Sequence, residues 1–444
     1  MRADASYKFP EDSRWGYFPS VSASWSLGNE SFFNIDAVDE LRFRLSYSQS
    51  GDDSGVAAYR YLSGFFIRTA QNYVADQRVW TLISEDVLPN PNITWLDMTI
   101  YNAGVNLSLY DGVFSTEFNL FQRTTDNIFG TPQEIFPSTF GASLPQLNIN
   151  ETRDRGFDLL IGHENIMGDF GYSISANVTY SREKYIRWSE SAFEDEDEAR
   201  LFQNQGNFTN RWIGYKSDGI FMNQEEIDNH DVDQDGAGNS TLRPGDIRYL
   251  DLNGDGELTW RDQTEIGRGM FPDLSFGINF DVNYRNFDLS ALFQGASMFN
   301  FNIGGRARGA FDNDGTPHVY QYKYRWQPDP DNPNVNINPD ARLPRVELFG
   351  VGTNENNNRP SDFWLVDATY LRLKNLSLSY TVPTTITNPI GINNLRLTAS
   401  GSNLLTWTRM GVFEDSFDPE IPGNTNTGNY PNVRVISFGI NLNF

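Results

Sequence analysis

Residues 101–120 read YNAGVNLSLYDGVFSTEFNL, a stretch in which apolar and polar side chains alternate on both sides of a turn. In its first half every second residue is apolar, and the residues between are Asn, Gly or Ser. The pair Asp111-Gly112 favours a tight reversal of the chain, and the alternation resumes at Phe114. Because successive side chains of a strand point to opposite faces, this stretch predicts a β-hairpin with one apolar and one polar face.

The same period of two recurs along the chain. It occurs in residues 20–27, 41–48, 101–109, 114–120, 157–161, 170–181, 274–284, 287–293, 376–382, 395–399 and 433–444. We expect about ten to twelve antiparallel strands, each near the length that a tilted strand needs to cross a bilayer. The last segment ends in an aromatic residue, Phe444, which favours a closing strand of a membrane barrel over an ordinary buried strand.

The connections separate a membrane barrel from a soluble sandwich, whose strands would also alternate. Short turns near 110–112 and 285–286 contrast with long polar connections near 126–153, 182–272 and 299–368. Outer-membrane barrels have short periplasmic turns and long extracellular loops, whereas structureless loops of this length are uncommon in soluble domains. The sequence therefore predicts an all-β fold, an antiparallel transmembrane β-barrel with long extracellular loops.

Composition narrows the class of protein further. No run of about 18 apolar residues occurs, which excludes a helical membrane protein. Aromatic residues make up 14% of the 444 residues, which suits aromatic girdles at two membrane interfaces. The formal net charge of −24 excludes nucleic acid as a partner, and the absence of cysteine excludes disulfides and thiolate metal sites.

One motif has the spacing of a calcium loop. Residues 251–262 read DLNGDGELTWRD, with glycine at the sixth position, where such loops turn sharply. The candidate ligands are Asp251, Asn253, Asp255, Glu257, Thr259 and Asp262. The twelfth position is Asp rather than the usual Glu, and the alternative is an acidic turn held by its own hydrogen bonds. We expect a structural Ca²⁺; residues 231–236 begin the same pattern, but Leu242 occupies their twelfth position.

Motifs of catalysis are missing from the sequence. The three histidines, His163, His230 and His318, lie in unrelated contexts, and there is neither a nucleophile elbow nor a phosphate-binding glycine loop. No two carboxylates are brought together at a defined spacing. We therefore expect a protein that is not an enzyme and has no catalytic or cofactor-binding residues.

Four stretches together resemble the SusC/RagA family of TonB-dependent outer-membrane transporters. They are RWGYFPSVSA at residues 14–23, PGDIRYLDLNGDG at 244–256, DATYLRLKNLSLSY at 367–380 and GSNLLTW at 401–407. The resemblance extends over essentially all 444 residues. It implies a barrel of about 22 strands with a plug in its lumen, a SusD-like lipoprotein lid, and energy supplied through TonB.

By this resemblance, residues 1–444 correspond to the C-terminal portion of the barrel. The N-terminal signal, the TonB-contacting segment and the plug are expected to be absent. About eleven strands would form a curved, incomplete barrel with two unpaired edges. The alternative is closure into a smaller, even-stranded barrel, which a hydrogen-bond ladder between the first and last strands would reveal.

The predicted function is part of an outer-membrane importer of oligosaccharides or peptides, embedded in the lipid bilayer. In the 299–368 connection we expect exposed loop aromatic residues to contact substrate or lid, because aromatic faces stack on sugars and bury area. The candidates are Phe311, Tyr320, Tyr322 and Trp326. Packing within the loop is the alternative role for these side chains. The alternative function is a soluble, secreted, calcium-stabilised adhesin or glycan-binding protein.

Overall fold

The computed structural model describes residues 1–75, 78–85, 88–133, 143–311, 315–347, 355–421 and 430–444. The chain divides into two compact units. Unit 1 comprises residues 1–159 and 181–209, and unit 2 comprises residues 160–180 and 210–444. Among the described residues, no helix is both long and apolar enough to cross a membrane.

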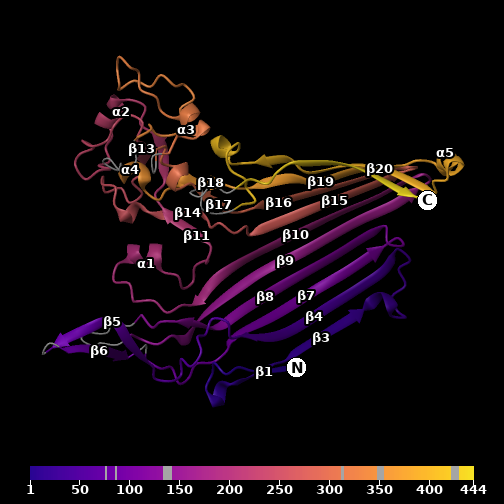
Figure 1. Ribbon diagram of the computed structural model, residues 1–444, viewed down its shortest axis with the longest axis horizontal. Helices are drawn as coiled ribbons and strands as arrows, with labels where there is room; N and C mark the ends of the chain where they lie inside the picture. The colour runs from indigo at the N-terminus through magenta and orange to yellow at the C-terminus, as the bar shows by residue number, and fades with distance from the viewer. Residues whose placement is uncertain (76–77, 86–87, 134–142, 312–314, 348–354, 422–429) are drawn as a thin grey trace. The chain divides into compact units, whose positions relative to one another are not determined.

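Unit 1 is built on long antiparallel strands that lie side by side (Figure 1). They are β3 (Ser20–Ser26), β4 (Val38–Asp52), β7 (Leu96–Leu109) and β8 (Phe114–Gly130), followed by halves of β9 (Leu147–Met167) and β10 (Phe170–Arg187). The predicted hairpin is present, with β7 and β8 paired from Leu109↔Phe114 to Asp97↔Asp126. Tyr110 and Asp111 adopt positive φ in its turn.

Unit 2 continues from the other halves of β9 and β10. Its further sheet strands are β15 (Leu274–Tyr284), β16 (Phe287–Ser297), β19 (Tyr370–Thr381), β20 (Asn394–Thr408) and β21 (Val435–Asn443). The strand order is β21-β20-β19-β16-β15-β10-β9-β8-β7-β4-β3, an 11-stranded sheet, which confirms the predicted fold class and strand number. β3 and β21 end this order, so the ladder that a smaller closed barrel requires is not among the described strand pairs.

The remaining elements are short and lie mostly in the connections. The strands are β1 (Arg2–Ala5), β2 (Trp15–Phe18), β5 (Phe65–Ala75), β6 (Arg78–Glu85), β11 (Arg211–Gly214), β12 (Ser217–Ile220), β13 (Ile247–Tyr249), β14 (Thr264–Arg268), β17 (Asn300–Asn302) and β18 (Leu365–Asp367). The α-helices are α1 (Glu196–Phe202), α2 (Gln224–Asp228), α3 (Val319–Tyr324), α4 (Glu355–Asn358) and α5 (Thr384–Thr387). The strands pair as β1-β2, β5-β6, β11-β14, β12-β13 and β17-β18.

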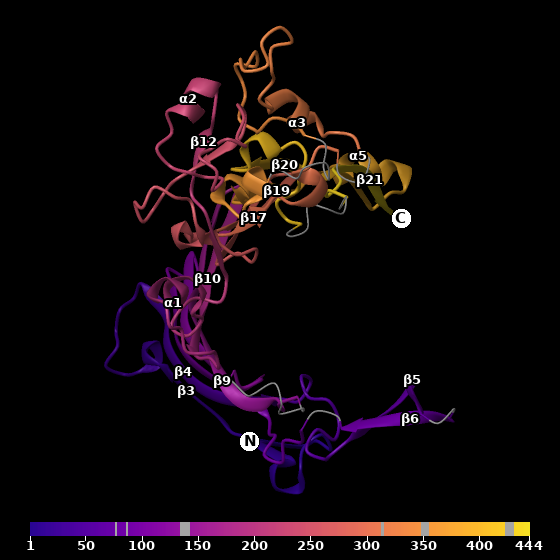
Figure 2. The ribbon, with the colours of Figure 1, turned by 90° about the vertical axis from the view of Figure 1, so that its left-hand side faces the viewer.

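The long connections of unit 2 carry a hydrophobic core of their own. They gather at one end of β16 and β19, where α2, β12, α3 and β17 lie together (Figures 1 and 2). The core includes the buried residues Tyr215, Ile247, Tyr249, Phe301, Trp326, Trp364, Met410 and Phe413. The connections predicted as long polar loops therefore also contain a packed core, in which scattered aromatic and aliphatic residues from distant segments contact one another.

Candidate functional site

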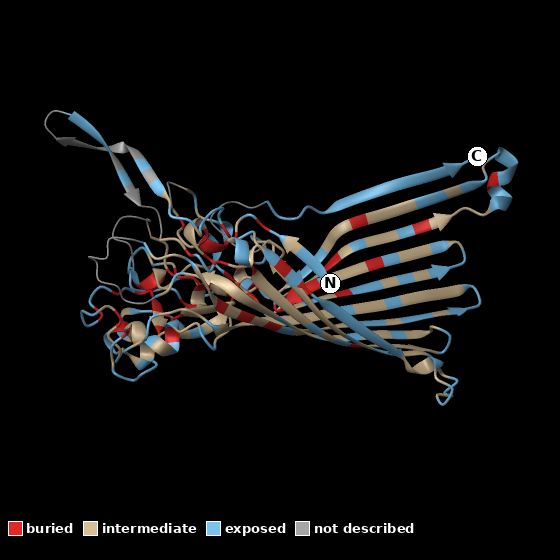
Figure 3. Ribbon diagram, turned by 90° about the horizontal axis from the view of Figure 1, so that it is seen from below, coloured by how far each residue is buried: buried red, intermediate tan, exposed pale blue. Residues whose placement is uncertain are grey.

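Side chains on one face of the unit 1 sheet form rows across the strands, and in the three rows described next all except Gln122 are apolar. The first row is Val21, Tyr47, Tyr101 and Gln122, the second Ala23, Leu45, Ala103 and Leu120, and the third Trp25, Phe43, Val105 and Phe118. Large members of these rows are open to the surroundings: Leu45, for example, is 63% exposed. Figure 3 shows that the long strands of the sheet carry few buried residues and are mostly intermediate or exposed. An exposed face of this kind would be unstable in water and matches the outer wall of a membrane barrel.

The height of the apolar face fits a bilayer. Along β7 the apolar positions run from Tyr101 to Leu109, which is roughly 27 Å of strand at about 3.4 Å per residue. At a strand tilt of about 40° this covers about 20 Å of membrane depth, most of the apolar band of about 25 Å in such barrels. Beyond Tyr101, towards the long connection that precedes β7, the same face becomes polar at Thr99 and Asp97.

The opposite face of unit 1 is polar and hydrogen-bonded. Arg44 Nη2 donates to Glu117 Oε1 at 2.6 Å and to Asn119 Oδ1 at 2.9 Å, and Asn119 Nδ2 donates to Glu117 at 3.1 Å. Gly104 makes room for this group, because a Cβ there would lie 2.2 Å from Asn119 Oδ1. This face can therefore line water or a polar partner.

Unit 2 repeats the two-faced arrangement. One apolar row crosses five strands through Val282, Leu289, Leu378, Ala399 and Phe438. Phe438 on β21 is 83% exposed. The alternation of the sequence is thus expressed as a continuous apolar face in each unit.

A bulge in β19 turns a charged residue towards the opposite face. The register with both neighbouring strands shifts around Lys374, so the apolar positions change phase there. Arg372, only 3% exposed, has Nη2 2.7 Å from Asp418 Oδ1 and Nη1 2.9 Å from Glu420 Oε2. Lys374 Nζ lies 2.7 Å from the same Glu420 oxygen. This cluster fixes part of the connection between β20 and β21 on the sheet.

The sequence did not single out this ion cluster. A usable signal existed, because Arg372 and Lys374 stand in a strand-like segment at a break in its period of two. The partners Asp418 and Glu420 lie 46 residues away in the chain from Arg372 and Lys374 respectively, and the spacing gives no hint of the pairing.

The predicted calcium loop is compact and rich in its own hydrogen bonds. Asp251 accepts from the amides of Gly254 and Gly256 at 2.6 and 2.8 Å. Asp262, fully buried, accepts from the amides of Leu252 and Thr259 at 2.9 and 2.7 Å. Burial opposes ionisation of Asp251, but hydrogen bonds led by the Gly256 amide hold its pKa below the ordinary value.

The other candidate ligands of this loop have different kinds of partners. Asn253 Nδ2 donates to Asp255 Oδ2 at 2.8 Å, and Thr259 caps the turn that contains Asp262. Glu257 is joined to Asp233 of the neighbouring acidic loop by a parallel bridge. In the part of the chain that the structure describes, no three His, Asp or Glu side chains are grouped as ligands of one metal ion. Calcium binding therefore stays a prediction.

The four candidate contact aromatics fall into two groups. Tyr320 and Trp326 are buried, at 3% and 2% exposure, so the expectation that they are exposed is wrong. The Tyr320 hydroxyl donates to Ala307 O at 2.5 Å, and burial raises the pKa of this hydroxyl; Trp326 Nε1 donates to Met222 O at 3.1 Å. These two rings have the alternative role, packing within the connection.

Tyr322 and Phe311 remain available for contact. Tyr322 is 67% exposed and stacks on the Arg325 guanidinium, whose carbon lies 4.4 Å from the ring centroid. Phe311 is partly buried. For these two side chains, contact with a substrate or a lid protein stays a prediction.

The histidines are dispersed in the structure. His163 stacks on Tyr172, His318 stacks on Tyr320, and His230 packs edge-on against Phe221. Burial lowers the pKa of His230 and of His318. Each histidine thus has a packing role in its own surroundings.

Solved structures share this fold. The RagAB peptide transporter matches 99% of the chain with a TM-score of 0.69 and 20% sequence identity, and the match covers 44% of that chain. The RagAB peptide importer in the open-open state matches with a TM-score of 0.71, also at 20% identity. The likeness shows that the sheet and its connections have the fold of part of these transporters.

Sequence comparison points to the same kind of protein. No family model matches the chain. Along its whole length it is 27% identical to TonB-dependent receptor P3 of Formosa agariphila and 21% identical to TonB-dependent receptor SusC of Bacteroides thetaiotaomicron. It covers 43% and 42% of these proteins, so it spans less than half the length of the curated relatives it matches. These relatives are receptors, and the resemblance predicted from the four sequence stretches is confirmed: the chain is similar over its entire length to SusC/RagA-type TonB-dependent receptors.

Proposed function

We propose that the chain forms wall strands and external connections of an outer-membrane importer for oligosaccharides or peptides. The observation that carries this proposal is the two-faced sheet, with an exposed apolar face and a hydrogen-bonded polar face in unit 1. A soluble adhesin would have to hide the exposed rows around Leu45 from water. The alternative of a secreted glycan-binding protein is therefore not favoured.

The proposed partner proteins are inferred from the relatives and not from contacts seen in this chain. The matched RagAB proteins are named as a peptide transporter, and the curated relatives are named as TonB-dependent receptors. We infer that the protein works with a SusD-like surface lipoprotein and draws energy through TonB. The exposed Tyr322, on the connection that carries α3, is the side chain that we assign to contact with the lid or the cargo.

The importer proposal predicts a membrane protein whose loss stops uptake. We expect the full-length protein to remain in the outer-membrane fraction after alkaline carbonate extraction. Deletion of its gene should abolish uptake of one fluorescently labelled oligosaccharide or peptide pool, and deletion of TonB should do the same. Recovery of a monodisperse protein from the culture medium without detergent would contradict the proposal.

Calcium is proposed as a structural ion of the 251–262 loop. The support is the ligand spacing, together with the hydrogen bond that Asp262 accepts from the Leu252 amide, which brings the twelfth position next to the start of the loop. These oxygen donors suit a hard cation. The ion would cross-link the two ends of the loop and order the connection between β13 and β14.

The calcium proposal can be tested with terbium, whose luminescence Trp260 would sensitise from inside the loop. We expect a dissociation constant for Ca²⁺, from displacement of terbium, of about 0.1–1 mM, as in extracellular modules. Asp251→Asn should weaken binding by about tenfold or more, because it removes a charged ligand. Asp329→Asn, in a different connection, is the matched control and should change nothing. Equal titrations for the wild type and Asp251→Asn would contradict the site.

A further inference from the structure

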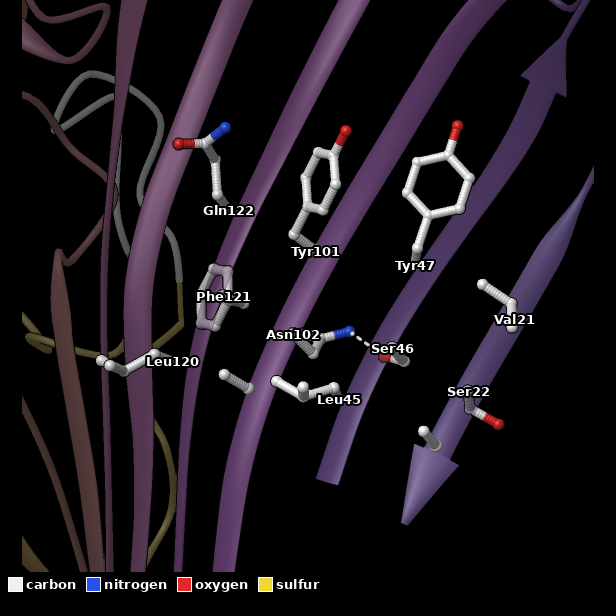
Figure 4. Close-up of a pocket in the computed structure, with 12 residues that line it drawn as sticks. Val21, Ser22, Leu45, Ser46, Tyr47, Tyr101, Asn102, Leu120, Phe121 and Gln122 are labelled. Carbon is white, nitrogen blue, oxygen red and sulfur yellow. Dashed lines mark hydrogen bonds between the residues drawn. The ribbon is translucent and has the colours of Figure 1, made fainter. Parts of the chain in front are cut away.

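The apolar face of unit 1 contains a hollow of about 500 Å³. It lies where the first two cross-strand rows meet, over Ala23 and Ala103, whose small side chains leave the space open. Figure 4 shows Tyr47 and Tyr101 standing side by side at one edge, with Leu45 and Leu120 at the other. The volume is within the range of small-molecule sites, roughly 300–1,000 Å³.

The walls of the hollow are almost entirely apolar. The Tyr47 and Tyr101 rings pack on each other with centroids 5.2 Å apart, and both present carbon faces along their length. Asn102 and Ser46 also border the hollow, but they hydrogen-bond to each other at 3.2 Å behind the strands. The hollow is open on its outer side, and the surface of its lining offers water almost no hydrogen-bond partners. The hollow therefore suits a hydrocarbon chain.

A cation stands at the edge of the apolar face, next to this hollow. Arg155 of β9 donates from Nε to Gln122 Oε1 at 2.7 Å, and Gln122 lines the hollow in the row of Tyr47 and Tyr101. Arg155 is exposed, and the partner of its side chain is the neutral amide oxygen of Gln122 rather than a carboxylate. An arginine on a membrane-facing surface is costly unless its head reaches the interface and meets an anion there.

The hollow lies nearer to the end of the strands that leads into long connections. Tyr47 is five residues before the end of β4, and Tyr101 is five residues after the start of β7. The opposite end of β7 enters the short turn at Tyr110. In a barrel whose long connections are extracellular, this places the hollow in the outer leaflet.

From these observations we propose a lipid site: one acyl chain of a lipid A-type glycolipid occupies the hollow, and the phosphate of that lipid binds Arg155. The proposal rests on the proposed function, because it requires the apolar face to meet the outer leaflet. The tyrosine hydroxyls would lie at the interface beside the headgroup, the usual position of such rings. The guanidinium supplies donors that match phosphate oxygens.

The test uses the full-length protein, purified in mild detergent, reconstituted with purified lipid A and examined by native mass spectrometry. Ala103→Phe fills the hollow and Arg155→Gln removes the charge. We expect each variant to retain about tenfold less lipid A than the wild type, as the loss of several methylene contacts or of one charged contact predicts. Ala23→Phe, from a different strand, should reproduce the effect of Ala103→Phe.

Two matched controls should retain lipid A as the wild type does. Val105→Phe adds the same ring to the same face of β7 outside the hollow, and Arg42→Gln removes an exposed arginine from the opposite face. Unchanged retention in Ala103→Phe or Arg155→Gln would overturn the proposal. Equal retention of a lipid with an uncharged headgroup would also overturn it. A dimer that Ala103→Phe dissociates would overturn it too, because this face would then be a contact between two copies of the chain.

The outcomes separate this proposal from the importer proposal. If the protein integrates into membranes but the variants retain lipid A normally, the lipid site alone is wrong. If the protein does not integrate into membranes at all, both proposals fail.

Discussion

Leu45→Arg is expected to lower the free energy of unfolding of the membrane-embedded protein by about 2–4 kcal/mol. Leu45 lies in the second apolar row of unit 1, one row inside the tyrosine pair and 63% exposed on that face. An arginine there would have to place its charge in hydrocarbon or distort the bilayer to reach water. The measurement is reversible urea unfolding of the full-length protein in lipid vesicles, together with its amount in the outer membrane.

Ser46→Arg is the matched control because it introduces the same side chain one residue away on the opposite face. Ser46 accepts a hydrogen bond from Asn102 at 3.2 Å, so its replacement should cost about 1 kcal/mol. If Ser46→Arg lowered the free energy of unfolding more than Leu45→Arg does, the face that carries Ser46 would be the one in contact with lipid. That result would remove the basis for both the importer proposal and the lipid site.

The sheet was predictable from the sequence because its signal is local. A period of two identifies the exposed and polar faces of a strand without knowledge of its neighbours, and the turn at Asp111-Gly112 identifies the β7-β8 hairpin. The number of strands in the sheet followed directly from the number of segments with this period. Strand bounds were less predictable: β8 extends to Gly130 and β9 begins at Leu147, inside the segment expected to be a loop.

The start of β19 was missed for a definite physical reason. The bulge at Lys374 shifts the alternation by one residue, so the segment from Tyr370 to Leu373 is out of phase with the segment from Leu376 onwards. A search for one unbroken period finds only the second part. The bulge is also what directs Arg372 to the opposite face, so the missed strand start and the missed ion cluster have one cause.

The candidate contact residues were less predictable than the strands. Exposure of an aromatic residue in a long connection depends on segments far away in sequence. Trp326, for example, packs in the core of the connections and donates a hydrogen bond to Met222, which is 104 residues away, and no periodic pattern records such contacts. Only the calcium spacing is fully local, because all of its candidate ligands lie within twelve consecutive residues.

Arg372→Leu is expected to destabilise unit 2 by about 3–5 kcal/mol, the usual cost of removing one partner from a buried ion pair. Asp418 and Glu420 have side chains only 5% and 12% exposed, and both would lose their guanidinium partner. Arg396→Leu is the control, because its pair with Asp288 is 45% and 33% exposed and should contribute less than about 1 kcal/mol. The measurement is the urea midpoint of the full-length protein in vesicles, with limited proteolysis of the connection between β20 and β21.

The pH dependence distinguishes a lost ion pair from lost packing. Burial would raise the pKa of Asp418, but the hydrogen bond from Arg372 and those from the Glu420 and Asn432 amides lower it below its ordinary value. A carboxyl with a lowered pKa stabilises the fold above its unfolded pKa of about 4, and this stability is lost as the pH falls through the folded pKa. The wild type should therefore lose stability between about pH 5 and pH 3, and Arg372→Leu should lose much less over the same range. Parallel pH profiles for the two proteins would mean that Arg372 stabilises the connection by packing alone.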